Sequence, residues 1–180
     1  MTEIFTMWGN VIIATLLTVP AAALAIFHLT RGRARRGHPA PLRSAVADVG
    51  IVIGTAPWIW MILTPSSRRN TVELAPFQVL IDLASGPWET AFVQVGGNLL
   101  VFAALGGLLP VRSARFTSLA RIALIAALAS MTVESLQYGL RLGRDSATDD
   151  VLVNTAGAVL AAVITRRWWA PAIPGRTVPR

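Results

Sequence analysis

The 180-residue sequence contains no cysteine, no lysine and only two histidines. Without cysteine, disulfide bonds and thiolate chemistry are excluded. His28 and His38 both lie in or beside an arginine-rich stretch, so we predict neither a histidine-rich metal site nor a cofactor. Charged residues are also scarce, at 14% of the chain against roughly a quarter in soluble domains.

Apolar residues take the place of the missing charges. They make up 54% of the chain, and the mean hydropathy is +0.59. Several nearly uncharged stretches are about 20 residues long, which is enough to cross a bilayer as a helix. The sequence therefore predicts an all-α, multi-pass membrane bundle. About five transmembrane helices are expected, at residues 7–29, 44–64, 90–110, 119–140 and 150–169.

The arginines predict how this bundle is oriented. Residues 31–43 contain five, residues 112–121 three and residues 166–180 four, whereas the alternate connections hold only Arg68, Arg69, Arg141 and Arg144. Because basic loops stay in the cytoplasm, the N-terminus is expected outside and the C-terminus in the cytoplasm. The net charge of +7 is then a topology signal, and no nucleic-acid partner is predicted.

Three segments follow from this topology. Residues 1–43 form an N-terminal transmembrane helix and a basic cytoplasmic loop, residues 44–169 the main membrane domain, and residues 170–180 a Pro-rich, disordered tail. The apolar connection at residues 65–89 is interrupted by Pro76. We interpret it as either an interfacial helix or a re-entrant segment.

Polar residues gather between residues 134 and 154, with apolar runs on both sides. Glu134, Gln137 and Arg141 are spaced to share one face of a helix, and Asp150 and Asn154 to share a face of the next helix. Asn98 is expected to join them from a third helix, with Gly96 and Gly97 allowing close contact. The predicted site comprises Asn98, Glu134, Gln137, Arg141, Arg144, Asp145, Asp149, Asp150 and Asn154.

The residue types leave two interpretations of this cluster open. One is a buried network that fixes helix packing; the other is a functional pocket, since ionisable residues within membranes often have functional roles. Paired arginines are suited to holding a phosphate, and Glu134 or Asp150 are the candidates for acid–base catalysis. No histidine lies near Ser130, Ser135 or Ser146, so the sequence offers no evident nucleophile–base pair.

The same segment resembles the VanZ-like family of bacterial membrane proteins. The residues that carry the resemblance are "GGNLLVFAALGG" (Gly96–Gly107), Glu134 with Gln137, Arg144 with Asp145, and Asp149, Asp150, Asn154 and Gly157; "ELAPFQ" is a weaker match. Glu73 departs from the asparagine that is usual in the family. The resemblance covers about residues 74–164 and implies a cell-envelope protein of the bacterial plasma membrane. Because the founding member of the family is associated with resistance to the glycopeptide antibiotic teicoplanin, it also implies a link to teicoplanin susceptibility.

Three functions remain as hypotheses. The first is a pocket on the extracytoplasmic side that binds an anionic lipid, a lipid-linked molecule or a glycopeptide among the surrounding membrane lipids. The second is an enzyme acting at the membrane surface on a lipid phosphate or peptidoglycan precursor. The third is a structural scaffold in which the polar cluster serves only packing. The sequence indicates no oligomeric state.

Overall fold

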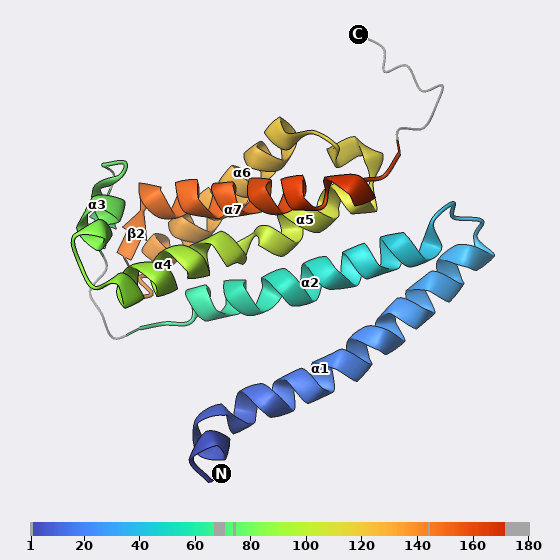
Figure 1. Ribbon diagram of the computed structural model, residues 1–180, viewed down its shortest axis with the longest axis horizontal. Coiled ribbons are helices and arrows are strands. Elements are labelled where there is room, and N and C mark those ends of the chain that lie inside the picture. Colours follow the sequence, from blue (N-terminus) through green and yellow to red (C-terminus); the bar gives the residue numbers. More distant parts are fainter. Residues whose placement is uncertain (1, 67–70, 74, 144, 172–180) are drawn as a thin grey trace. The chain divides into compact units, whose positions relative to one another are not determined.

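The computed structural model describes residues 2–66, 71–73, 75–143 and 145–171, and their fold is helical as predicted (Figure 1). Two strands of three residues each, β1 and β2, pair in parallel, with Thr71 opposite Asp145. The elements in chain order are α1 (Thr2–Arg35), α2 (Pro41–Leu63), β1 (Thr71–Glu73), α3 (Gln78–Ala84), α4 (Trp88–Val101), α5 (Ala103–Arg112), η1 (Ala114–Phe116), α6 (Leu119–Gly139), β2 (Asp145–Ala147), α7 (Thr148–Ile164) and η2 (Arg166–Trp168).

Among the described residues, three helical stretches are long and apolar enough to cross a membrane: α2, α4 together with α5, and α6. The helices expected at residues 44–64 and 119–140 are found within three residues of those limits. The helix expected at residues 90–110 is interrupted at Phe102, where one residue leaves the helical conformation between α4 and α5. The last expected helix is shorter, because α7 ends at Ile164 and the 3-10 turn η2 follows.

The chain divides into two compact units, Met1–Val49 and Gly50–Arg180. In the first unit, the guanidinium of Arg33 joins the end of α1 to the start of α2. It forms an ion pair with Asp48 and donates a hydrogen bond of 3.1 Å to the hydroxyl of Ser44. Ser44 is fully buried, so this polar group is satisfied where water does not reach it.

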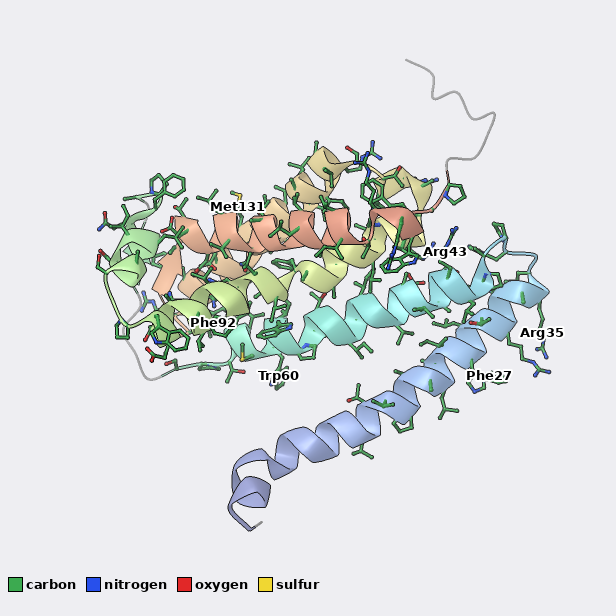
Figure 2. The ribbon with its side chains drawn as sticks, in the orientation of Figure 1. Phe27, Arg35, Arg43, Trp60, Phe92 and Met131 are labelled. Atoms are coloured by element: carbon green, nitrogen blue, oxygen red, sulfur yellow. The ribbon has the colours of Figure 1, made fainter. Side chains whose placement is uncertain are left out.

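In the second unit, α7 packs against α4, α5 and α6 (Figure 1). The core between these helices is made of Val101, Phe102, Ile122, Ala126, Val133, Ala158 and Ala162. The outer surfaces of the helices are apolar instead of charged. Trp60 on α2 and Phe92 on α4 are 79% and 72% exposed, as expected of side chains that face lipid (Figure 2).

Glycine sets the distance between α7 and its neighbours. A Cβ at Gly157 would overlap the backbone carbonyl of Leu99 on α4, and a Cβ at Gly106 would overlap that of Ala158 on α7. Backbones therefore touch at both points, as in other close contacts between membrane helices. The close contact expected at Gly96 and Gly97 is not found, because a Cβ at either position meets nothing within 4 Å.

This contact predicts opposite effects for two Gly→Ala substitutions. Gly157→Ala is expected to lower the free energy of unfolding by about 1–3 kcal/mol, because the backbone of α4 must move to admit a methyl group. Gly96→Ala, on the α4 helix, is the matched control and is expected to be neutral or stabilising by up to about 1 kcal/mol. Thermal unfolding in detergent, followed by circular dichroism, measures both. Equal unfolding temperatures for Gly157→Ala and the wild type would show that the contact is dispensable.

Candidate functional site

The predicted polar residues meet at one end of the second unit, which we call the acidic end. It consists of β1, β2, α3, the last two turns of α6 and the first two turns of α7 (Figure 1, left). Helix α6 supplies Glu134 and Gln137, and α7 supplies Asp149, Asp150 and Asn154. Asn98 joins them from α4. The structure therefore brings predicted residues of three helices together, and their contacts separate them into groups.

Asp149 holds the connection between α2 and α4. Its carboxylate is 2% exposed and accepts hydrogen bonds from the backbone N–H groups of Phe77 and, at 3.1 Å, Leu80. Phe77 directly precedes α3 and Leu80 lies in its first turn, where backbone donors lack helical partners. Asp149 thus caps α3 from a distant part of the chain. It does not cap its own helix, because α7 begins after Ala147 without a side-chain cap.

The backbone conformation of Phe77 explains why the hydrogen bonds to Asp149 are needed there. Its φ angle of 68° lies in the left-handed region, which non-glycine residues rarely adopt. Two hydrogen bonds to a buried carboxylate offset the cost of this conformation. In the connection predicted as an interfacial helix or a re-entrant segment, the described residues include the strand β1 and the seven-residue helix α3, which is folded onto the start of α7.

Two asparagines join α7 to two neighbouring helices. Asn98 on α4 donates to the carboxylate of Asp150, and Asn154 donates to the hydroxyl of Ser130 on α6 at 2.9 Å. Asn154 and Ser130 are buried, at 3% and 0% exposed. Amide hydrogen bonds of this kind hold membrane helices together. These contacts favour a packing role for Asn154.

Gln137 joins α6 to the end of α2. It is 5% exposed, and its side-chain amide donates a hydrogen bond of 2.8 Å to the carbonyl of Ile62 in the last turn of α2. Carbonyls at this end of a helix have no partner within the helix. Ser66 reinforces the junction, because its backbone N–H donates to the carbonyl of Leu142 at 2.7 Å. Gln137 therefore attaches α2 to α6.

Glu134 lies beside a pocket of about 390 Å³, which the Asp149, Asn154 and Gln137 side chains do not line. One wall of the pocket is formed by four residues on one face of α6, namely Met131, Glu134, Ser135 and Tyr138 (Met131 is labelled in Figure 2). The other walls are Val72 of β1, Ala147 of β2, and Thr148 and Val151 of α7. The pocket combines apolar walls with one carboxylate and three hydroxyl groups, so it suits a ligand with both an apolar part and hydrogen-bonding groups.

The remaining predicted residues lie in the connection after α6. The expected shared face of Glu134 and Arg141 is wrong, because α6 ends at Gly139 and Arg141 is exposed with a left-handed φ of 54°. Arg144 lies outside the described residues. Asp145 is described only by its backbone, which pairs with β1. Ligand contacts of these three residues remain predictions.

Of the eight described residues that line the pocket, only Glu134 was among the predicted site residues. The spacing of Met131, Glu134, Ser135 and Tyr138 by three, four and seven places them on one helical face, so a signal for the α6 wall was present. No sequence pattern indicated Val72, because the pairing of two three-residue strands, β1 and β2, brings this residue to the pocket wall. Among the described residues, no group of three His, Cys, Asp or Glu side chains is arranged to hold a metal ion.

The fold, with its apolar exposed helices, fits a membrane protein. A family model described as VanZ/LLP1 matches residues 51–169, which is more than half of the chain. The chain therefore belongs to the VanZ/LLP1 family, and the resemblance stated from the sequence is confirmed. No curated protein and no solved structure matches the chain.

The role of Asp149 is testable by hydrogen exchange. Asp149→Ala removes both acceptors from the first turn of α3, so the amides of Phe77 and Leu80 are expected to exchange at least tenfold faster. Asp82→Ala is the control, because this exposed carboxylate accepts a bond from the side chain of Gln78 at 3.3 Å, whereas the amides of Phe77 and Leu80 donate to Asp149. The full-length protein undergoes exchange and is then digested. Mass spectrometry measures the deuterium content of the peptide that contains α3. Unchanged protection in Asp149→Ala would refute the capping of α3 by Asp149.

Proposed function

We propose that this chain is a multi-pass protein of the cell envelope whose pocket at the acidic end binds an anionic lipid or a lipid-linked molecule. Membership of the VanZ/LLP1 family and the apolar helices support the membrane location. The arginine distribution supports an extracytoplasmic acidic end. The single observation that carries the binding proposal is the pocket beside Glu134.

The lining of the pocket is suited to an amphiphile. Val72, Met131 and Val151 offer apolar surface to a hydrocarbon chain, and the volume of about 390 Å³ lies within the usual range for small-molecule sites. Glu134 accepts hydrogen bonds when ionised, so the part of the ligand facing it carries hydroxyl or amine donors. Tyr138 is half-exposed at the rim and offers a phenolic hydroxyl to the same group.

A phosphate on the same ligand requires a different partner, because a carboxylate repels it. We assign that role to Arg141 and Arg144, which follow α6 in the sequence. Arginine is the side chain best suited to phosphate because its guanidinium donates two parallel hydrogen bonds. The ligand class is therefore a lipid whose head group carries both a phosphate and hydroxyl or amine groups. A link to glycopeptide susceptibility follows if that molecule is a cell-wall precursor.

Filling the pocket tests this proposal. Met131→Trp places a large ring in the lining, whereas Leu124→Trp makes the same change two turns away at a side chain of similar exposure, 59% against 54%. Purified protein is titrated with phosphatidylglycerol and with a prenyl phosphate, and the unfolding temperature is recorded. We expect Met131→Trp to weaken stabilisation by either lipid at least tenfold in concentration and Leu124→Trp to leave it unchanged.

Two further variants separate the head-group contacts. Glu134→Gln is expected to weaken the binding of phosphatidylglycerol more than that of the prenyl phosphate. The substitution changes the carboxylate that accepts hydrogen bonds from the hydroxyl groups of the lipid head group. Arg144→Ala is expected to weaken both. If Arg144→Ala leaves every shift unchanged, the phosphate role is wrong. If Met131→Trp also does so, the pocket is not the binding site.

The lining position of Glu134 also favours a second candidate, an enzyme acting at the membrane surface on a lipid phosphate or peptidoglycan precursor. Glu134 is then the general base, since Asp150 accepts a bond from Asn98 and does not line the pocket. The purified protein would consume such a substrate, and Glu134→Gln would stop turnover while retaining ligand binding. Binding without turnover in the wild type supports the binding function alone.

A further inference from the structure

A second set of charges lies at the opposite end of the second unit, which we call the basic end. It consists of the last turn of α5, η1, the first turn of α6 and η2, and its arginines are Arg112, Arg115, Arg121, Arg166 and Arg167. Two hydrogen bonds hold η2 against α5. Thr165 donates its hydroxyl to the carbonyl of Gly107 at 2.7 Å, and the N–H of Ala170 donates to the carbonyl of Pro110 at 2.9 Å.

The charge of this end is not balanced by nearby acids in the sequence. Residues 90–133 and 151–180 contain no Asp or Glu. Arg115, Arg121, Arg166 and Arg167 are exposed, and the structure gives none of them a carboxylate partner among the described residues. Such a concentration of one charge attracts anions from a distance and holds them on contact.

Two tryptophans order the arginines of η2. The guanidinium of Arg167 lies 4.1 Å from the ring centroid of Trp168, and that of Arg166 lies 5.9 Å from the ring centroid of Trp169. Trp169 is fixed in turn, because its indole N–H donates to the carbonyl of Ala162 at 3.1 Å. A ring that covers the face of a guanidinium leaves the N–H groups at its edge available for oxygen atoms.

We propose that the basic end binds the phosphate head group of an anionic phospholipid. Apolar surface adjoins the arginines, because Trp168 is 49% exposed and Ile164, at the end of α7, is 71% exposed. A phosphate with attached acyl chains fits both features, whereas a free phosphate or a nucleic acid would leave the apolar surface unused. Tryptophan is also typical of the level where head groups meet hydrocarbon. This surface shares no residue with the pocket at the acidic end.

Lipid titration of the full chain tests the proposal. The probes are phosphatidylglycerol, phosphatidylcholine and inorganic phosphate, and binding is read by native mass spectrometry from a neutral detergent. Phosphatidylglycerol is expected to bind most tightly. To leave the pocket at the acidic end out of the measurement, the double variant R166Q/R167Q is compared with its parent in the Met131→Trp background, where it is expected to lose about 25-fold in affinity, from about fivefold for each arginine. The control R35Q/R36Q removes the same charge from an exposed part of the first unit and is expected to lose less than threefold.

Three results would overturn the proposal. The first is wild-type affinity in R166Q/R167Q, and the second is an equal loss in R35Q/R36Q, which would leave only general charge attraction. The third is inorganic phosphate displacing phosphatidylglycerol at a similar concentration, which would make the acyl chains irrelevant. Circular dichroism checks folding of the double variant. If the double variant unfolds, R167K is tested instead, because it keeps the charge but loses the planar guanidinium group. R167K is expected to bind several-fold more weakly, and wild-type affinity would refute the site.

Discussion

The backbone contact of α7 with α4 and α5 is the constraint on which the second unit depends. In lipid, apolar side chains gain little by leaving one apolar environment for another, so helices associate through close packing and hydrogen bonds. Gly157 and Gly106 supply the close packing, because each brings a helix backbone against the other helix where a Cβ would overlap it. With the distance fixed at these two points, the polar side chains of α7 reach fixed partners.

Those partners belong to four different elements. Asp149 binds the first turn of α3, Asp150 accepts from α4, Asn154 donates to α6, and Thr165 donates to α5. A buried polar group without a partner costs several kcal/mol in a medium without water, so each bond also determines where its neighbour lies. Most of the charged and amide residues that suggested a ligand site are therefore used to assemble the helices. This moves the expected ligand from α7 towards α6, where Glu134 lines a pocket.

The sequence predicted those parts of the structure that depend on interactions between residues close together in the chain. Apolar length gave the positions of α2 and α6, and spacing placed Glu134 and Gln137 on one helix beside the acids of α7. Features set by tertiary contact were missed. The break at Phe102 occurs at a residue with no intrinsic tendency to end a helix, and the capping of α3 by Asp149 joins segments about 70 residues apart. Arg141 was misplaced for a local reason, because α6 stops at Gly139, a poor helix former.

The two ends of α7 carry opposite charges, and the helix itself explains part of this. Acids in the first turn and arginines just beyond the last turn both complement the helix dipole, each by about 0.3–1 kcal/mol. That contribution does not account for an arginine-rich surface without nearby acids, or for Glu134, which is on another helix. The arginines also agree with the predicted topology, in which basic loops face the cytoplasm. We propose that ligands bind at the two ends. Because α7 is fixed by backbone contacts near its middle, a substitution at one end changes local hydrogen bonds without displacing the other. The proposed binding at the pocket and the proposed binding at the basic end are therefore expected to be separable by substitution.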